Sequence, residues 1–418
     1  MKGKNPLFKL SSILASLVSM FCIGIVYLWS VFQQPVIDHY GWDVSAVTMV
    51  SSAIVFFYVV GNLIGGVLND KLSPRVVTMI GAVLFCLGLF LTSLLGSAHP
   101  FLIYLTYGVC AGLGVGFGYS AALSCIQKWF PHRRGFASGI SVCAFGLATV
   151  VLGPLIEWLL ARFGVPGTFR ILAFTFPVVV FVMALFISNP TQAYIDSLNL
   201  PRTQSVQRQY TTKEAVCTLE FWSIALSFFF MPAAYMMIIP RIKTLGVLRG
   251  LTPAMTTLTV SLTGVASAAS RLIAATVSDK FGRAWTLWTL IALTLVASLL
   301  MIFATGWLYI VIVLVIVCGY SGPSGIFAAM TTDAFGTKHQ GANYGCVFMF
   351  LGFSSVIFTY LSTLLSAGGA ETGNYTTSFI VAAAGCVIPL VMLPFYNSAR
   401  KKHRERDEAI AEQQKKAE

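Results

Sequence analysis

Apolar segments of similar length recur along the whole chain. Each is close to the ~20 residues that an α-helix needs to cross the hydrocarbon core of a bilayer. Short polar loops join the segments, and one longer polar loop follows the sixth. The pattern predicts an all-α membrane protein with twelve transmembrane helices in two six-helix halves. The expected segments are 9–33, 45–68, 76–97, 101–127, 135–160, 168–188, 218–239, 254–278, 285–305, 307–331, 343–366 and 376–397.

The same pattern divides the chain into four regions. They are an N-terminal bundle (1–188), a cytoplasmic linker loop (189–217), a C-terminal bundle (218–397) and a basic cytoplasmic tail (398–418). The first apolar segment, roughly Phe8 to Phe32, is too long for the apolar region of a signal peptide. It also lacks a clear small-residue cleavage site. We therefore interpret it as a retained first helix.

Composition agrees with a membrane protein, because 57% of the residues are hydrophobic and only 10% are charged, unlike an ordinary soluble domain. Most of the nine cysteines lie inside predicted segments and none forms a CxxC pair, so we interpret them as apolar packing residues. The chain has no embedded His cluster, no Cys–His pair at ligand spacing and no paired carboxylates. We expect neither an enzyme nor a bound cofactor or metal.

The basic residues predict an orientation. Of the 27 Lys and Arg residues, 21 fall on the side of the two termini and the long loop. The positive-inside rule places that side in the cytoplasm, and we expect a plasma membrane or a bacterial inner membrane. The basic tail, which begins "RKKHRER" at Arg400, is interpreted as an anchor at the membrane surface. Nucleic-acid binding is not expected.

The two halves repeat one another at an interval of about 207 residues. "NDKLSPRVV" from Asn69 matches "SDKFGRAWT" from Ser278, and "WFPHRRGFASG" from Trp129 matches "AFGTKHQGANYG" from Ala334. "GLGVGFGYS" from Gly112 corresponds to "GYSGPSG" from Gly319. A repeat of six plus six helices is the plan of a transporter whose halves move about a site near the membrane midplane.

The residues after the second and eighth segments resemble the loop signature of the major facilitator superfamily. The first copy carries Asp70, Lys71 and Arg75, and the second carries Asp279, Lys280 and Arg283. Ser73 and Pro74 depart from the usual Gly-Arg of the first copy. Acids and bases at helix ends can pair with one another and with helix dipoles. We predict that these six residues gate the cytoplasmic side. The alternative is that they only set the orientation.

A narrower resemblance rests on "WFPHRRGFASGISVCAFGLATVVLGPL", "YLWSVFQQPV", "SDKFGR" and "GANYG". These stretches resemble the oxalate/formate antiporter family, which is close to the monocarboxylate transporters. The likeness covers nearly the whole chain and implies the major facilitator fold and a secondary carrier.

Arg271 is the one basic residue placed deep inside a predicted segment, in "SLTGVASAASRLIAATVSDK". It stands about 12 Å from the cytoplasmic end of its helix at Asp279, at ~1.5 Å rise per residue. An arginine near mid-bilayer costs ~2.5–3.5 kcal/mol on insertion scales. The acids of the chain lie at helix ends and in loops, except Glu157 near an outer end. We therefore predict that the carboxylate paired with Arg271 belongs to the substrate. The alternative is a structural role, such as binding helix carbonyls.

The resemblance supports this role, because the oxalate/formate family has an arginine at the position of Arg271. The oxalate carrier of that family also has a lysine in its eleventh helix, which binds the second carboxylate. In this chain the eleventh segment is 343–366, and Leu351 occupies the place of that lysine. One buried positive charge suits a monoanion, since a dianion would leave one carboxylate unpaired. The prediction is a small monocarboxylate such as lactate, pyruvate or formate.

Other candidates for the pocket are aromatic or polar. Tyr27 and Gln34 are seven residues apart and share a helix face, and Tyr119 and Tyr320 occupy symmetric places in the repeat. In the resembling family, aromatics at the positions of Tyr27, Trp29, Tyr119 and Tyr320 wall the cavity. The alternative for any one of them is packing or lipid contact.

The sequence therefore predicts a secondary transporter that works by alternating access. Its expected partners are a small carboxylate anion, with a proton if transport is coupled, and the lipid bilayer. A monomer is expected. Two alternatives stay open: an exchanger of oxalate or another dicarboxylate for formate, and a sensor with the same fold that does not transport.

Overall fold

The computed structural model describes residues 6–191, 194–195, 209–238, 242–372 and 375–417. The regular elements in these ranges are all helical. The first half of the chain consists of α1 (Pro6–Ile23), η2 (Gly24–Leu28), α2 (Trp29–Tyr40), α3 (Val44–Lys71), α4 (Pro74–Thr92), η3 (Tyr104–Ala111), α5 (Gly112–Trp129) and α6 (Arg134–Ala184).

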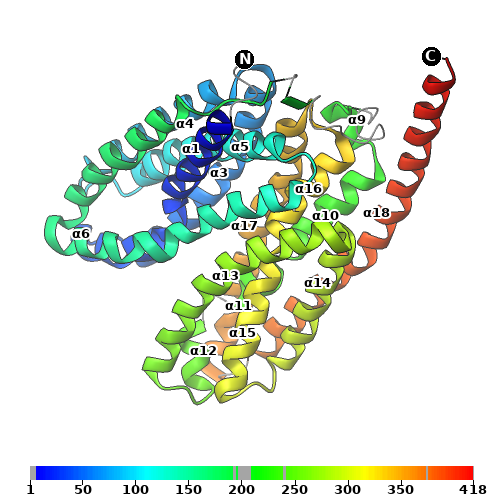
Figure 1. Cartoon of the computed structure of the whole chain (residues 1–418). Coiled ribbons are helices and arrows are strands. Elements are labelled where there is room, and N and C mark those ends of the chain that lie inside the picture. The colour runs from blue at the N-terminus through cyan, green and yellow to red at the C-terminus, as the bar shows by residue number, and fades with distance from the viewer. Residues whose placement is uncertain (1–5, 192–193, 196–208, 239–241, 373–374, 418) are drawn as a thin grey trace.

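Most of the linker 189–217 lies outside the described residues, but its end contains the short helix α9 (Thr212–Val216). The helices of the second half follow: α10 (Leu219–Phe230), α11 (Ala233–Ile238), α12 (Ile242–Leu248), α13 (Pro253–Phe281), α14 (Arg283–Leu300), α15 (Gly306–Ser321), α16 (Pro323–Phe335), α17 (Gln340–Thr372) and α18 (Thr376–Ala417). Figure 1 shows the halves as two helical bundles.

Within the described ranges, eleven helical stretches are long and apolar enough to cross a bilayer. The longest is α6, with 51 residues, and its helical conformation is interrupted at Gly164 (φ 65°, ψ −175°). That backbone conformation favours glycine, which has no Cβ. The two arms of α6 correspond to the expected segments 135–160 and 168–188. Counting both arms gives twelve spans and confirms the expected fold class.

Several helix starts follow from local sequence. The Ser73 hydroxyl accepts a hydrogen bond from the backbone N–H of Val76, and Pro74 occupies the first turn of α4. Thr252 and Pro253 start α13 in the same way. Such caps satisfy backbone N–H groups that have no partner inside the helix. The departure from Gly-Arg at residues 73 and 74 therefore supplies a helix start.

Other spans are interrupted. A 3₁₀ segment, η2, separates α1 from α2, and a π-helical segment, η3, precedes α5. Pro232 separates α10 from α11, because proline lacks the N–H that would continue the helix. By contrast, α18 continues through Ala417, so residues 398–417 of the predicted tail continue the last helix.

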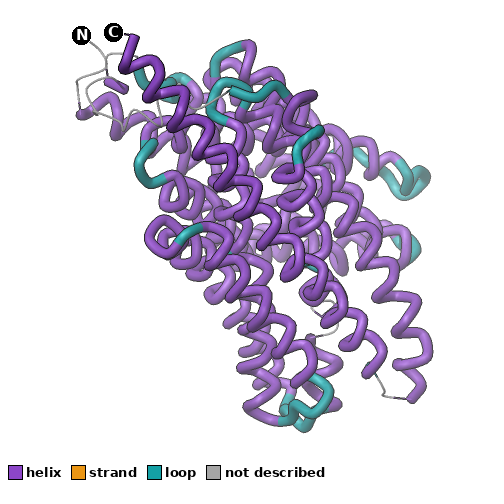
Figure 2. The backbone as a smooth tube through the Cα atoms, turned by 90° about the vertical axis from the view of Figure 1, so that its right-hand side faces the viewer, coloured by secondary structure: helices purple, strands orange, loops and turns teal. Residues whose placement is uncertain are grey.

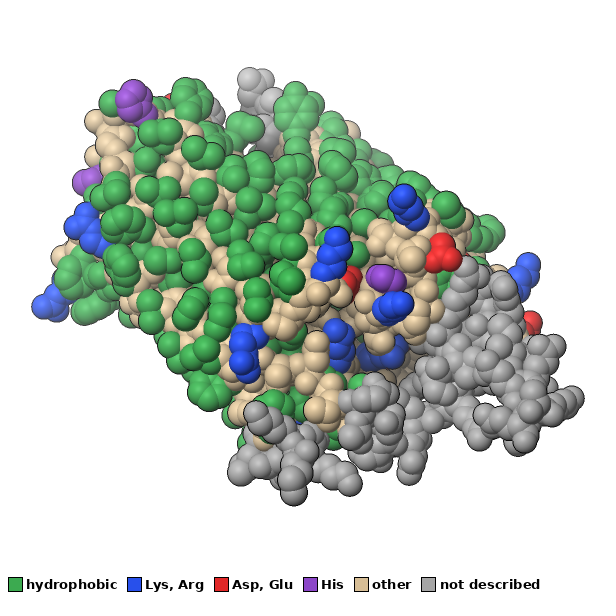
Figure 3. All heavy atoms as spheres, turned by 90° about the horizontal axis from the view of Figure 1, so that it is seen from above, with side chains coloured by type: hydrophobic (Ala, Val, Ile, Leu, Met, Phe, Trp, Pro, Cys, Tyr) green, Lys and Arg blue, Asp and Glu red, His purple; other side chains and the backbone are tan. Residues whose placement is uncertain are grey.

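The start of α1 and the end of α18 lie at the same end of the molecule (Figures 1 and 2). The view onto this end shows several Lys and Arg side chains grouped together (Figure 3). The side chains of Lys71, Arg75, Arg133 and Lys280 are exposed at the helix ends and loops. This end is called the terminal end below.

The most extensive contacts between the halves are those of α3 with α17 and of α6 with α13. Both pairs approach closely. A Cβ placed on Gly66 would overlap the carbonyl group of Gly341, and one placed on Gly139 would lie 2.8 Å from the Cβ of Ala275. Small residues let helix backbones pack closely inside a membrane. The interface between the halves therefore depends on these glycines.

We predict that Gly66→Ala destabilises the protein, because the added methyl group has no space against Gly341. Overpacking a tight contact costs about 1–3 kcal/mol, so the apparent Tm of the purified protein should fall by several degrees. The matched control is Gly96→Ala, where a Cβ would meet no atom within 4 Å. Equal melting temperatures for the two variants would show that the α3–α17 contact is not this tight.

Candidate functional site

Arg271 lies in the middle of α13, and its side chain is only 6% exposed. Its Nη1 donates a hydrogen bond to the backbone carbonyl of Val142 on α6 at 3.2 Å. The guanidinium carbon stands 5.8 Å from the centroid of the Tyr27 ring, within reach of a cation–π contact. Its Nε has no hydrogen-bond partner. Arg271 therefore reaches from the second half into contacts with the first half, while part of its hydrogen-bonding capacity stays unused.

Close packing fixes the position of this guanidinium. On one side, a Cβ on Gly146 of α6 would lie 3.1 Å from Cζ of Arg271 and closer still to Nη1. On the other side, Ser267 Oγ lies 2.7 Å from Ser321 Oγ, and Ser270 Oγ donates to the carbonyl of Cys318 at 2.9 Å. These bonds tie α13 to α15. A side chain larger than glycine at position 146 would displace the guanidinium.

No Asp or Glu in the described ranges comes within 4.0 Å of Arg271 as an ion pair. A buried charge without a counter-charge is strongly unfavourable. The arrangement is therefore suited to receive an anion. In the same ranges, no group of three His, Cys, Asp or Glu residues could hold a metal ion.

The guanidinium borders a small cavity between the two halves. Its volume is about 20 Å³, which is room for roughly one water molecule. Three of the predicted aromatic residues line it, Tyr27, Tyr119 and Tyr320, and so does Leu351. The full lining is Tyr27, Tyr58, Tyr119, Val142, Phe145, Phe228, Arg271, Tyr320, Ser321, Ser324, Phe348 and Leu351.

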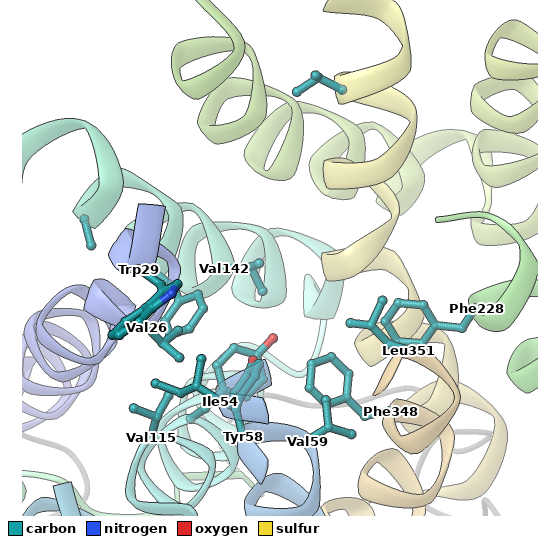
Figure 4. Packing of buried hydrophobic residues seen from close by; sticks show 14 of the residues in the cluster. Val26, Trp29, Ile54, Tyr58, Val59, Val115, Val142, Phe228, Phe348 and Leu351 are labelled. Atoms are coloured by element: carbon teal, nitrogen blue, oxygen red, sulfur yellow. The ribbon is translucent and has the colours of Figure 1, made fainter. Parts of the chain in front are cut away.

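An aromatic cluster forms one wall of this cavity. Tyr119 packs against Phe145 and Phe348, with ring centroids 5.3 Å and 5.7 Å apart. Tyr58 contacts all three, at 5.4 to 5.7 Å. Figure 4 shows Tyr58 of the first half near Phe348 of the second. The cluster keeps the surroundings of the guanidinium apolar, while the tyrosine hydroxyls supply hydrogen-bond donors.

Sequence reasoning missed Tyr58, Phe145 and Phe348. Each lies in a long apolar helix, where one aromatic residue looks like any other. One signal in the sequence could have marked Tyr58 as facing the bundle interior. Asn62 lies four residues later, so a polar residue stands one turn from the tyrosine on the same helix face.

Two predicted pocket residues lie elsewhere. Trp29 is buried, its Nε1 donates to the carbonyl of Val47 at 3.0 Å, and its ring packs on Tyr107 at 4.9 Å. In Figure 4 it lies on the far side of the cluster from Leu351. Gln34 is exposed on α2, where its Nε2 donates to Asp38 at 2.8 Å. Neither borders the cavity.

The predicted gating acids each bind the start of a helix in the opposite half. Asp70, at the end of α3, accepts hydrogen bonds from the backbone N–H groups of Gly341 (3.1 Å) and Ala342 (2.9 Å) of α17. Asp279, in the last turn of α13, accepts from Gly135 (3.0 Å) and Phe136 (2.7 Å) of α6. A carboxylate is favourable at a helix N-terminus, where N–H groups and the helix dipole point toward it. These contacts hold the halves together at the terminal end.

The bases were expected to pair with these acids, and among the ion pairs of the described residues Arg283 is the predicted base that does so. Its Nη1 lies 2.6 Å from Asp279, and its Nε lies 3.0 Å from Asp333. Arg134, which the sequence did not single out, binds Asp333 across the halves at 3.1 Å. Lys71, Arg75 and Lys280 are exposed. The second copy of the signature thus carries a charge network that the contacts of Asp70 do not repeat.

Known proteins resemble this chain over most of its length. The family model described as Major Facilitator Superfamily matches residues 13–248 and 224–417. An oxalate:formate antiporter of Oxalobacter formigenes is 25% identical, with 92% of this chain and 90% of that protein covered. Monocarboxylate transporter 13 of Rattus norvegicus is 25% identical, with 88% and 83% covered. The resemblance expected from the motifs is confirmed.

Solved structures confirm the fold. The E. coli fucose:proton symporter FucP matches with a TM-score of 0.70 and 15% identity over 92% of this chain and 98% of that chain. The human organic anion transporter MFSD10 also matches with a TM-score of 0.70, at 12% identity over 93% and 100% of the two chains.

We predict that Asp279→Asn weakens the joint between the halves, because the amide loses both the charge and the ion pair with Arg283. Hydrogen bonds to charged groups contribute about 1.5–3 kcal/mol, so the apparent Tm should fall by roughly 3–10 °C. Asp38→Asn on the exposed face of α2 is the control. A similar fall in both variants would mean that the Asp279 contacts add nothing specific.

Proposed function

This chain belongs to the major facilitator superfamily, and we propose that it moves a small monocarboxylate across the membrane by alternating access. The observation that carries the proposal is the buried guanidinium of Arg271, which has no carboxylate partner in the described part of the chain. A substrate carboxylate supplies the missing charge.

The unused hydrogen-bonding capacity of Arg271 supports carboxylate binding. Its Nε has no partner, and a guanidinium presents Nε and one terminal nitrogen as a fork that fits two carboxylate oxygens. Tyr27 and Tyr320 line the same cavity, and their hydroxyl groups are possible donors to the same anion. The aromatic wall makes the surroundings apolar, which strengthens an ion pair.

The residues that line the cavity also favour a monoanion over a dianion as the substrate. Leu351 borders the cavity, and Arg271 is the only Lys or Arg among the lining residues. A second carboxylate would be desolvated beside leucine without a cation. The oxalate:formate antiporter that resembles this chain makes oxalate a necessary competitor in any substrate test.

Alternating access follows from where the halves touch. Polar contacts through Asp70, Asp279 and Arg134 close the terminal end. Their rupture would open the cavity toward that end, and their formation would close it again. The positive-inside rule supports a cytoplasmic location for the terminal end and for the linker 189–217. One chain supplies every residue of the proposed site, so a monomer suffices, and the process needs no cofactor.

We expect Arg271→Gln to abolish uptake of labelled lactate into proteoliposomes. Loss of a charge-assisted bidentate contact should lower uptake by about 100-fold or more. Arg162→Gln, which removes the same charge from an exposed site near the opposite end, should leave uptake unchanged. Normal uptake by Arg271→Gln would make Arg271 structural.

Formate and pyruvate should inhibit this uptake more strongly than oxalate. The reverse order would favour the exchange of a dicarboxylate. Binding of these acids to the wild type without any uptake would favour a sensor.

We also predict that Leu351→Lys shifts the preference toward dicarboxylates. The variant places a second cation on the cavity wall, so oxalate should inhibit lactate uptake at least about tenfold better than in the wild type. Leu351→Met keeps the volume and apolar character of the side chain and serves as the control. If both variants respond to oxalate alike, the charge of the wall does not set the preference.

A further inference from the structure

A second, smaller cavity lies between the substrate cavity and the terminal end. Its volume is about 10 Å³, and it is lined by α5 from the first half and by α16 and α17 from the second. Tyr344 borders it and packs against Phe348 of the substrate cavity, with ring centroids 5.4 Å apart. The full lining is Ser120, Leu123, Ser124, Gln127, Ala328, Gln340, Gly341 and Tyr344. We call this set the polar seam.

The side chain of Gln127 forms hydrogen bonds to residues of both halves across the polar seam. It is 2% exposed, and its Oε1 accepts a hydrogen bond from Thr332 Oγ1 at 2.9 Å and another from Gln340 Nε2. Its Nε2 donates to Ser138 Oγ. Thr332 and Gln340 belong to the second half, whereas Ser138 belongs to the first. One amide therefore joins α5 and α6 of one half to α16 and α17 of the other.

Other polar atoms along the seam have no partner. These are Ser124 Oγ and Gln340 Oε1, and both are buried. Asn62, one turn from Tyr58 on α3, is fully buried with both amide atoms unpaired. An unpaired polar group inside a bilayer is unfavourable by several kcal/mol. Water would satisfy such atoms in an arrangement in which the two halves separate here.

We propose that the polar seam is the cytoplasmic half of the transport route and that Gln127 closes it. This rests on the proposed transport function for the direction and purpose of the opening. In the closed form, Gln127 holds Thr332 and Gln340 of the opposite half. In the open form, water replaces these bonds and hydrates the unpaired atoms, and the substrate leaves between α5 and α17. The contacts of Asp70 and Asp279 break in the same movement.

The test is the access of a cysteine in the seam from the terminal side. Ser124→Cys is introduced because serine and cysteine differ little in size and Ser124 Oγ has no partner to lose. The protein is placed in inside-out vesicles without substrate and treated with a membrane-impermeant thiol reagent. Labelling of the same protein without Ser124→Cys is subtracted, because the chain has nine cysteines of its own.

With Gln127→Ala added, we expect labelling about five- to thirtyfold faster, since two bonds between the halves are lost. The control is Gln33→Ala, where an amide bonded to Thr48 at 2.9 Å is removed far from the seam. Thr332→Val removes one bond from the opposite side with little change in shape and should give a smaller increase. Adding it to Gln127→Ala should give no further increase, because the bond is already absent.

Equal labelling rates for Ser124→Cys alone and with Gln127→Ala or Thr332→Val added would overturn the proposal. A single cooperative melting transition identifies variants that are folded, and complete labelling in SDS shows that the thiol is present and reactive. Thr332→Val decides the question if Gln127→Ala misfolds. Because no substrate is used, the result is independent of the uptake test on Arg271. Faster labelling with normal transport by Arg271→Gln would keep the route and reject the proposed substrate contact.

Discussion

The guanidinium of Arg271 is buried in the helix bundle with no carboxylate partner among the described residues, and it constrains much of the structure around it. The position needs space on α6, which Gly146 provides, and a fixed α13, which Ser267 and Ser270 provide through α15. It also needs apolar surroundings, which the rings of Tyr58, Tyr119 and their neighbours provide. Without the charge these features would be ordinary helix packing. With it, they surround the position at which we propose that an anion binds.

Anionic groups also hold the terminal end together, but there the protein itself supplies them. Asp70 and Asp279 each bind the N-terminus of a helix from the other half. Backbone N–H groups cannot move away from their helix, so these contacts act on whole helices rather than on side chains. A movement that releases the carboxylates releases α17 and α6 together. This links opening of the end to the helices that border Arg271.

The sequence predicted the spans well, because the length of an apolar segment is set by the bilayer. Arg271 was also predictable, since a lone charge at that depth is unfavourable. The partners of Asp70 and Asp279 were not, because they are backbone groups that no side-chain pattern marks. Tyr58 escaped because apolar helices carry no sign of which face meets the other half. Trp29 was misleading for the same reason, since its indole is satisfied by the carbonyl of Val47.

The polar seam shows why a single packing does not explain this sequence. A chain required only to keep the halves closed would place apolar residues at position 124 of the seam and at the nearby position 62, where the side-chain polar atoms have no partner. Their cost is offset if a second arrangement hydrates them. Gln127 fits this view, because its bonds to Thr332 and Gln340 are complete in the closed form and replaceable by water in the open one. A hydrogen bond within the protein and a hydrogen bond to water differ little in free energy, so the closed and open arrangements stay close in free energy. A carrier needs that balance to pass repeatedly through both.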